Sequence, residues 1–428
     1  MILENPIISI IIPVFNVEKY LHECLDSVIN QTLQDIEIIC VDDKSTDSSS
    51  QILKLYAQQD SRVKIINNDK NKGTLLARKT AVLQAKGKYI VFVDSDDMLH
   101  SSNALAILYQ MIETEDVDIL QFNINLLFPD GTTQLGDGWF QLYEKKLSNN
   151  YEIISSCIDN QYNWCLWSKI YKTEVCIKAF QEVKDVYLIT AEDCYTYFLI
   201  AYYAQSFIGK ATSSPLYNYR QGAGITSTEN LDLTRFEMFC KENLITNYLE
   251  EFLQKHNDLD NYIVVLNNLS QRFLSNCFWR LEQIYEEEKD TAFHMIFQHF
   301  SPKEIYYFMN QELVKERRIH AEILESECQQ YADLLQQERN THAKELAAER
   351  WQHADLLKQE RIAHAHELAT ERKQNADFRK NISQFNIGRY LRTKILSRMT
   401  FGDVRKQLST QYKQQKRIYG MIKNRNSS

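Results

Sequence analysis

Short apolar runs alternate with helix-like segments over the first hundred residues, and this alternation limits the possible folds of the chain. The runs are rich in β-branched residues and span residues 7–14, 36–41, 63–66 and 89–93. The segments between them carry apolar residues at helical spacing. Strands and helices in this order form a mainly parallel sheet with helices on both faces. We therefore predict an α/β, Rossmann-like domain.

Polar side chains follow each of the four runs, at the point where each predicted strand ends. They are Asn16, the pair Asp42 and Asp43, Asn67, and the acids of 94–97. In a parallel sheet, ligands bind beyond the carboxyl ends of the strands. These residues therefore mark the edge where a binding site is expected.

The most acidic of these strand ends is Asp94-Ser95-Asp96-Asp97. Asp94 and Asp96 are two residues apart, so on an extended chain both side chains point to the same side. Carboxylates this close repel one another, and a hard divalent cation such as Mn²⁺ or Mg²⁺ relieves the repulsion. An acidic turn that leads into a helix is the alternative, and these residues alone leave both readings open.

Motifs around the four runs resemble a known family. In order they are Ile-Ile-Pro-Val-Phe-Asn, Val-Asp-Asp-x-Ser-Thr-Asp, Asn-x-Gly-x-x-x-Ala-Arg and Gly-x-Tyr-Ile-x-Phe-x-Asp-Ser-Asp-Asp, within residues 6–100. This series is similar to the family 2 nucleotide-sugar glycosyltransferases of bacterial surface-glycan synthesis, which implies the GT-A fold and inversion at the anomeric carbon. Two residues depart from the pattern: Lys44 replaces the usual Gly, and Lys79 replaces a common Asn.

The resemblance implies roles for individual residues. Asp96 is the expected principal ligand of the metal ion, with Asp94 supporting the metal or the ribose of a UDP-sugar. An ordinary acid at a helix start is the alternative for Glu18, and Asp47 is assigned to helix capping. The remaining residues expected to bind the nucleotide-sugar are Pro13, Phe15, Asn16, Glu18, Asp42, Asp43, Arg78 and Ser95.

A catalytic base is expected at Glu192-Asp193. Inverting transfer needs one carboxylate to deprotonate the acceptor hydroxyl, and the resemblance implies an acid here. Asp193 is the preferred base and Glu192 the reserve, while an N-cap acid of the following helix is the alternative. Trp164 and Trp167 are the expected platforms for the acceptor sugar.

The rest of the chain divides by its patterning. A helix is expected over 101–115, one strand over 118–127, a surface excursion over 128–150 and a closing strand over 215–220. Helical spacing of apolar residues dominates 231–300. The predicted domains are a GT-A domain at 1–228, with a nucleotide half at 1–100 and an acceptor half at 101–228, a helical subdomain at 229–302, a long helix at 303–378 and a basic tail at 379–428.

An 11-residue repeat runs through the predicted long helix. Eleven residues in three turns keep an apolar stripe in register along one helix, which cannot bury that stripe alone. A coiled-coil stalk that self-associates through 321–376 is therefore favoured over a single solvated helix. The repeated residues are Ala321, Ala332, Ala343, Ala354, Ala365 and Ala376, with Leu324, Leu335, Leu346, Leu357 and Leu368 at a constant offset.

The charge of the chain is uneven. Its net charge is −8, yet residues 378–428 hold 13 Lys and Arg against one acid, Asp403. A basic amphipathic segment at 385–399 suits an anionic membrane surface. A solvated tail is the alternative. Binding to nucleic acid is not favoured, because no recognition motif accompanies the charge.

Nine scattered cysteines without a Cys-x-x-Cys pair indicate reduced thiols. A cytoplasmic protein at the inner face of the membrane is expected.

These patterns predict a metal-dependent inverting glycosyltransferase that acts on a growing, lipid-linked or free surface glycan. Two alternatives remain. An aspartate-nucleophile phosphatase also begins with Asp-x-Asp after an apolar strand, although Met98 stands where it needs Thr or Val. A non-catalytic scaffold, with the repeat as its working part, would bind no UDP.

Overall fold

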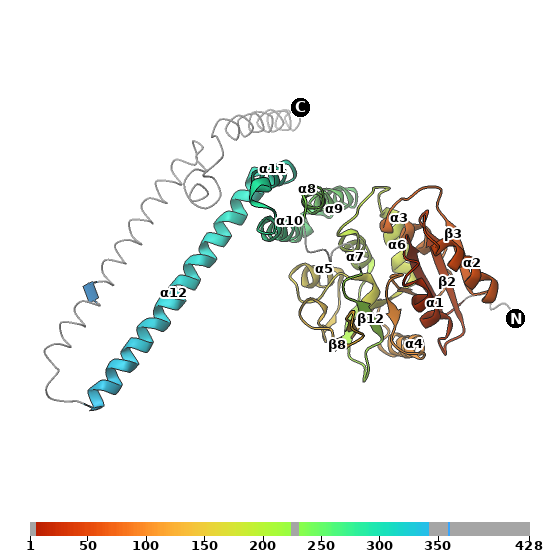
Figure 1. The fold of residues 1–428 in the computed structure, drawn as a ribbon, viewed down its shortest axis with the longest axis horizontal. Helices are drawn as coiled ribbons and strands as arrows, with labels where there is room; N and C mark the ends of the chain where they lie inside the picture. The colour runs from red at the N-terminus through yellow and green to blue at the C-terminus, as the bar shows by residue number, and fades with distance from the viewer. Residues whose placement is uncertain (1–5, 224–230, 342–357, 360–428) are drawn as a thin grey trace. The chain divides into compact units, whose positions relative to one another are not determined.

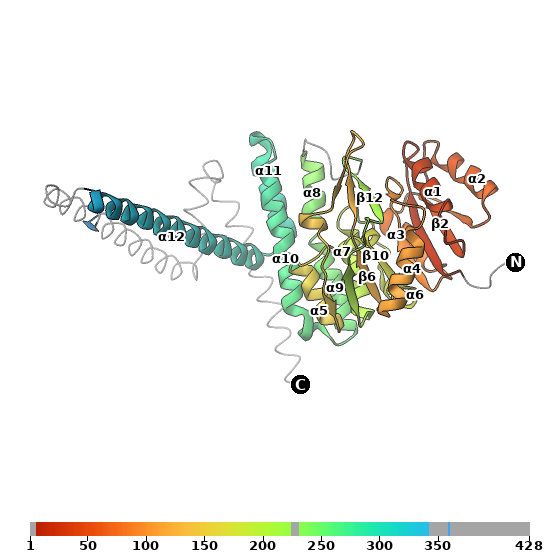
Figure 2. The same ribbon diagram turned by 90° about the horizontal axis from the view of Figure 1, so that it is seen from below.

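The computed structural model describes residues 6–223, 231–341 and 358–359. It forms two units, residues 1–300 and residues 301–428, each of which is described by itself. The first unit holds the sheets and the helices packed on them (Figure 1, Figure 2).

The first unit is built on an eight-stranded sheet in the order β3-β2-β1-β4-β10-β6-β11-β9. Neighbouring strands are parallel from β3 to β4, whereas β10 is antiparallel to both β4 and β6. The predicted α/β fold with a mainly parallel sheet is confirmed, but the antiparallel strand in its middle was not predicted. The strands are β1 Ile8–Val14, β2 Ile36–Asp42, β3 Val63–Asn67, β4 Tyr89–Phe92, β6 Ile119–Phe122, β9 Lys146–Leu147, β10 Lys169–Lys172 and β11 Phe207–Lys210.

Helices cover both faces of this sheet, as predicted. One face packs against α1 Leu21–Ile29, α2 Ser49–Gln59 and α4 Ala104–Glu115, whose apolar sides join the alternate residues of β1 in one core. The opposite face packs against α3 Thr74–Val82 and α6 Thr173–Glu182. Phe92 stacks there on Phe180 with ring centroids 6.1 Å apart. Burial on both faces explains why these strands are nearly continuous apolar runs.

A smaller sheet lies beside the acidic strand end, in the order β5-β12-β7-β8. The single strand predicted over 118–127 is wrong, because β6 belongs to the large sheet and β7 to the small one. Asn123 lies at the break, where its side chain accepts a hydrogen bond from the backbone N of Thr212 at 2.9 Å. The strands are β5 Met98–Leu99, β7 Asn125–Leu127, β8 Thr133–Leu135 and β12 Tyr217–Arg220.

Further helices complete the first unit, and the second unit contains one long helix. They are α5 Asn150–Ile158, α7 Glu192–Tyr203, α8 Leu233–Lys241, α9 Leu244–Lys255, α10 Leu259–Leu281 and α11 Lys289–His299, then α12 Pro302–Thr341. A capping box begins α12: Ser301 N donates to Glu304 Oε2 at 2.7 Å, and Glu304 N donates to Ser301 Oγ at 3.2 Å.

Part of the predicted stalk can be followed in the structure. The repeat begins inside α12, whereas its members from Ala343 onward and the basic tail lie outside the described residues. Self-association and membrane contact therefore stay predictions. Within the described ranges, no helix has the length and apolar character that a membrane crossing requires.

Candidate active site

The loops after β1 and β2 are fastened to each other by reciprocal hydrogen bonds. Glu18 Oε2 accepts from Ser48 N at 2.7 Å, and Glu18 N donates to Asp47 Oδ2 at 3.0 Å. Asn16 Oδ1 accepts from Thr46 N at 2.7 Å. Glu18 therefore ties two loops together, since α1 begins only at residue 21. Asp47 Oδ1 accepts from Ser49 N at 3.0 Å, so Asp47 caps the first residue of α2 as expected, although the N-cap position itself is Ser48.

Phe15 is the exposed apolar side chain of this pair of loops, with 42% of its surface accessible. Pro13 precedes it at the end of β1 and is only partly exposed. An exposed aromatic ring at the carboxyl edge of the sheet can stack on a nucleotide base. The position of Phe15 is therefore compatible with the base-binding role that the sequence predicts.

Asp42 and Asp43 are both buried and hold the adjoining loops in place. Asp43 accepts hydrogen bonds from the Asn68 side chain at 2.6 Å and from Gly73 N at 2.7 Å, and Asp42 Oδ1 accepts from Ser45 N at 2.9 Å. Their predicted contact with the nucleotide-sugar stays a prediction.

The unusual residue of this turn is Lys44. Its φ is +68°, in the left-handed region where glycine is favoured. A glycine would adopt this backbone conformation without strain, which gives a physical reason for the Gly that the resemblance leads us to expect here.

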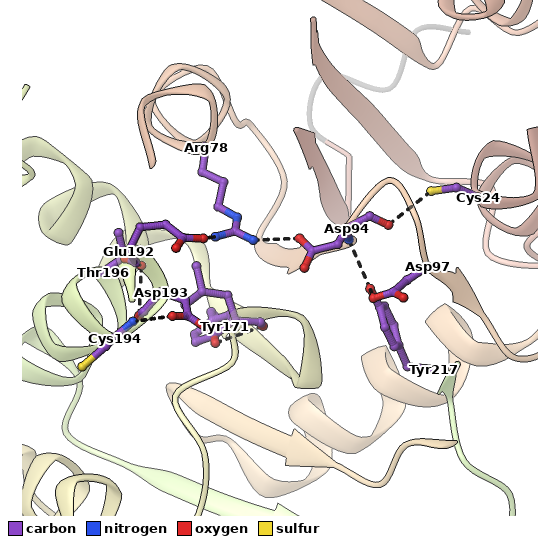
Figure 3. A network of polar contacts seen from close by, with 11 residues as sticks. Cys24, Arg78, Asp94, Asp97, Tyr171, Glu192, Asp193, Cys194, Thr196 and Tyr217 are labelled. Atoms are coloured by element: carbon purple, nitrogen blue, oxygen red, sulfur yellow. Dashed lines mark hydrogen bonds and ion pairs between the residues drawn. The ribbon is translucent and has the colours of Figure 1, made fainter. Parts of the chain in front are cut away.

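Asp97, the last acid after β4, is enclosed and anchors the small sheet. Its carboxylate accepts from the Tyr217 hydroxyl at 2.8 Å and from Arg220 N at 2.7 Å. The same Tyr217 oxygen accepts from Asp94 N at 3.1 Å, so one hydroxyl bridges both acids (Figure 3). Asp97 therefore fixes the acidic turn to β12.

Asp96 differs from its neighbour. Burial raises the pKa of its carboxyl to about 6, and the charge of Asp94 adds to the shift. Arg220 donates to the backbone O of Asp96 at 2.9 Å. The backbone N–H of Asp96 and the charges of Arg220 and Arg78 oppose the rise of the pKa of this carboxyl. A buried carboxylate held close to another one has the character of a cation ligand.

A metal ion at this position would need ligands from outside the protein. Within 6–223, 231–341 and 358–359, no group of three or more His, Cys, Asp or Glu side chains is placed to hold a metal ion. Asp94 and Asp96 alone fit a partial site, because Mg²⁺ usually binds through one or two carboxylates together with substrate phosphates.

Arg78 of α3 joins the acidic strand end to the predicted catalytic base. Its Nη2 donates to Asp94 Oδ1 at 2.7 Å, and its Nη1 donates to Glu192 Oε1 at 3.0 Å (Figure 3). Only 4% of the Arg78 side chain is exposed. This guanidinium lies between two carboxylates from distant segments. Its predicted contact with the nucleotide-sugar stays a prediction.

Glu192 and Asp193 form the first turn of α7, directly after Ala191, whose φ is +55°. The alternative of an N-cap acid does not hold, because the N-cap is Ala191. Burial raises the pKa of the Asp193 carboxyl to about 8, and the neighbouring Glu192 adds to the shift. Burial also raises the pKa of Glu192, although the charge of Arg78 opposes that shift.

The two predicted acceptor platforms differ from expectation. Trp167 is 4% exposed and stacks on Tyr217 and Tyr219, with centroids 5.0 and 4.9 Å away. It is a core residue behind the acidic turn, so its prediction as an open platform is wrong. Trp164 is partly buried, and the Arg272 guanidinium lies 3.8 Å from its ring centroid.

Sequence reasoning missed two residues of this region. The Tyr217 hydroxyl organises Asp94 and Asp97, but a tyrosine in a closing strand carries no sequence signal for that role. Lys169 is fully buried, and its Nζ donates to the carbonyls of Asn163 at 2.9 Å and Cys165 at 2.8 Å. Burial lowers its pKa to about 8.

The structure thus has a mainly parallel sheet whose strand ends gather carboxylates, and Arg78 links one of these strand ends to the start of α7. Residues 9–164 match the model of Glycosyl transferase family 2. This part of the chain is therefore a family 2 glycosyltransferase domain.

Curated relatives agree with this family. The chain is 28% identical to the putative glycosyltransferase EpsH of Bacillus subtilis over 269 residues, which are 61% of this chain and 73% of EpsH. It is 50% identical to the poly(ribitol-phosphate) beta-glucosyltransferase of Bacillus spizizenii over 115 residues, which are 26% of this chain and 18% of that one. Most other curated relatives are matched over half of their length or less.

Among solved structures, Staphylococcus aureus TarS residues 1–349 in complex with UDP-GlcNAc is similar with a TM-score of 0.43 and 19% identity. The similarity covers 71% of this chain and 92% of that one.

Proposed function

We propose that this chain is a metal-dependent inverting glycosyltransferase that moves a sugar from a UDP-sugar to a hydroxyl of a growing surface glycan. The match of residues 9–164 to the family model supports a nucleotide-sugar donor and sugar transfer. The choice of UDP, the metal, the inversion and the acceptor are parts of the proposal. The predicted domain boundaries are also part of the proposal, and we place the transferase site in the first unit.

The observation that carries the proposal is the link through Arg78. Asp94 follows β4, and Glu192 lies at the start of α7, 98 residues later in the chain. The Arg78 guanidinium donates a hydrogen bond to each of these two carboxylates. The expected donor side and acceptor side of the reaction therefore meet in one place. Such a meeting is what a single displacement reaction between two substrates needs.

The donor would lie along the carboxyl edge of the sheet. The base would stack near Phe15, and the diphosphate would lie near Asp94 and Asp96, where a Mn²⁺ or Mg²⁺ ion would be held. When bound there, that ion supplies positive charge to the leaving diphosphate. Asp97, Tyr217 and Arg220 keep the acidic turn in position.

Asp193 would accept the proton of the attacking hydroxyl. The hydroxyl oxygen forms a bond to the anomeric carbon, the bond from that carbon to the diphosphate oxygen breaks, and UDP leaves with the electron pair. Attack from the face opposite the leaving group inverts the anomeric centre. A carboxylate with a raised pKa is a stronger base than an ordinary one, so it suits this step near neutral pH.

The acceptor class is proposed from the relatives. The Bacillus spizizenii relative is named as a beta-glucosyltransferase of poly(ribitol phosphate), and a Bacillus subtilis relative is named for teichuronic acid biosynthesis. A surface glycan, free or lipid-linked, is therefore proposed here. Contact of the basic tail with an anionic membrane and self-association through 321–376 would hold the enzyme near such an acceptor.

A screen of UDP release tests the proposal. Wild-type chain is incubated with a set of UDP-, GDP- and TDP-sugars, with Mn²⁺ and with EDTA. We expect release from a UDP-sugar only with the metal, and loss of release in Asp96→Ala by at least about 100-fold, since metal charge stabilises the leaving group by several kcal/mol.

The matched control for this screen is Asp116→Ala, which removes an exposed acid in the left-handed turn after α4. It should leave release unchanged. Full turnover by Asp96→Ala, or equal turnover in EDTA, would contradict the metal-dependent mechanism, and release from GDP- or TDP-sugars alone would contradict the choice of UDP.

A further inference from the structure

Trp139 lies in the excursion 128–150, which the sequence describes only as a surface loop. It belongs to the short turn η1 Gly138–Phe140. It keeps 37% of its surface exposed, whereas Phe140, the next residue, is partly buried. An exposed tryptophan that is held in place is unusual enough to ask what it contacts.

The turn around Trp139 is fixed at several points. Its own backbone O accepts from the Asn163 side chain at 3.3 Å. Phe140 lies 5.1 Å from the ring of Tyr219 and 5.7 Å from that of Trp167. Gly136 N donates to Ile124 O at 2.8 Å, and a Cβ on Gly136 would come within 2.8 Å of the Ile124 side chain. The turn is therefore seated closely on the small sheet beside the acidic strand end.

The indole of Trp139 also contacts Trp164 and Arg272. Its ring meets Trp164 edge to face with centroids 5.1 Å apart. The Arg272 guanidinium of α10 lies 4.6 Å from Trp139 and 3.8 Å from Trp164, and Arg272 Nη1 donates to the last carbonyls of α5, Cys157 O and Ile158 O, both at 3.2 Å. Because Arg272 is fixed to α5, the two indoles cannot turn freely.

The helices around this aromatic pair adjoin the proposed base, because α5 packs against both α7, which carries Asp193, and α10, which carries Arg272. Burial raises the pKa of the Cys165 thiol, the charge of Asp193 adds to that shift, and a hydrogen bond with the Trp139 side chain opposes it. Burial lowers the pKa of Arg272, and Asp193 is among the groups that oppose the change. Cys165 and Arg272 are thus near both Trp139 and Asp193.

We propose that the exposed face of Trp139 is a stacking platform for a pyranose ring of the acceptor. This inference rests on the proposed function, since an acceptor hydroxyl must reach Asp193 and the rest of the acceptor must extend over the adjoining surface. A pyranose with equatorial hydroxyls presents a face of C–H groups, which packs well on an indole ring. The platform is rigid before binding, so little conformational freedom is lost when the sugar is bound.

The choice of occupant follows from the same contacts. The Arg272 guanidinium is engaged with two indoles and two carbonyls, so the platform offers a flat apolar surface and not a free cation. A pyranose ring fits such a surface, whereas a polyol phosphate would require charge at this point. Trp139 therefore favours a saccharide as the unit next to the reacting hydroxyl.

Saturation-transfer NMR on the full chain tests the platform without requiring turnover. The probe is methyl β-D-glucopyranoside, added with UDP and Mn²⁺, and ribitol 5-phosphate is the competing probe. We expect saturation of the ring C–H protons of the glycoside in the wild type and a signal at least about fivefold weaker in Trp139→Ala, as for truncation of an aromatic anchor. Trp139→Phe should retain part of the signal.

The matched control is Trp279→Ala, which removes a 62% exposed tryptophan of α10. It should leave the glycoside signal unchanged, and thermal unfolding shows whether Trp139→Ala remains folded. Equal signals in Trp139→Ala and wild type, no saturation of the glycoside by the wild type, or saturation of ribitol 5-phosphate alone would each overturn the inference. Failure of UDP release with glycoside binding intact would instead count against the proposed function.

Discussion

Adjacent acids in this site have different roles because their surroundings differ. Asp97 accepts hydrogen bonds from Tyr217 and Arg220 of the small sheet. Glu192 is paired with Arg78 of α3, while Asp193 beside it accepts from the adjacent Cys194 N. Burial raises the pKa of all four carboxyls, so the contacts and not the pKa values distinguish them. We assign Asp97 and Glu192 to holding the fold and Asp96 and Asp193 to chemistry.

The pairing of Arg78 predicts a large effect of its removal. Arg78→Met would leave Asp94 and Glu192 without their shared cation, and breaking a buried ion pair costs about 3–5 kcal/mol. Because both carboxylates are partly exposed, we expect a loss of unfolding free energy at or below the lower end of that range, measured by urea denaturation.

Arg78→Lys serves as the control for that change. Lysine keeps the charge but has no planar fork, so it cannot pair with both acids in the same geometry. It should recover most of the stability and little of the transfer rate. Recovery of full transfer by Arg78→Lys would contradict a role that depends on both contacts.

The raised pKa of Asp193 predicts how transfer depends on pH. The carboxyl must be ionised to accept a proton, so kcat/KM should rise with pH and level off above about pH 8. Stability should change in the opposite sense. The folded-state pKa lies above the unfolded value, so the contribution of Asp193 to stability is present at low pH and is lost as pH rises towards 8.

Asp193→Asn is the test of that assignment, because it keeps the shape of the side chain and removes the base. We expect transfer to fall by about 100-fold or more and its dependence on pH to flatten. Glu192→Gln serves for comparison, since it removes the partner of Arg78. A pH profile that is unchanged in Asp193→Asn would assign the base to another residue.

At the scale of secondary structure, the crossover from α3 to β4 is tightly constrained. Gly87 lies just before β4, and a Cβ there would come 2.6 Å from Ser9 N and 2.8 Å from Ile8 C. Overpacking of this kind costs about 1–3 kcal/mol. We therefore expect Gly87→Ala to lower the unfolding free energy by such an amount in urea denaturation, since the displaced atoms are backbone.

Gly131→Ala is the comparison, because a Cβ at Gly131 meets nothing within 4 Å. Its φ is +83°, so a smaller loss of about 1 kcal/mol is expected from the backbone alone. A loss for Gly87→Ala no larger than this one would show that the neighbouring strand can move aside.

The nucleotide-binding half of the fold was predictable because its signals are local. Apolar runs, helical spacing and polar strand ends all occur within a few residues of one another, and β1 to β4 lie where they were predicted. The insertion of β10 between β4 and β6 was not predictable, since it pairs strands from distant parts of the chain. The division of 118–127 between two sheets depends on Asn123 and its contact with Thr212, which no local pattern reveals.

The site was also predictable only in part, because its motifs are local and its contacts are not. Asp94, Asp96 and Asp193 were identified as acids by their motifs, but their environments required three-dimensional contacts. Arg78 was assigned to the donor because an arginine signals an anion without saying which one. Trp167 was assigned to the acceptor because sequence does not distinguish a buried tryptophan from an exposed one, and Trp139 was passed over for the same reason.

At the scale of the whole molecule, the chain combines a transferase unit with a long helix. The capping box at Ser301 and Glu304 begins α12 next to the unit boundary. The residues that we propose for transfer all belong to the first unit. The long helix and the basic tail are proposed to determine where the enzyme acts and with how many copies.

The central claim is that the acidic strand end binds the diphosphate of UDP through a divalent cation. Isothermal titration calorimetry with UDP measures it directly, with Mn²⁺ or with EDTA, on the wild type and on Asp96→Asn. We predict binding that requires Mn²⁺ and is weakened at least about tenfold in Asp96→Asn, which is about 1.4 kcal/mol. Equal affinity for UDP in EDTA, or in Asp96→Asn with Mn²⁺, would contradict the claim.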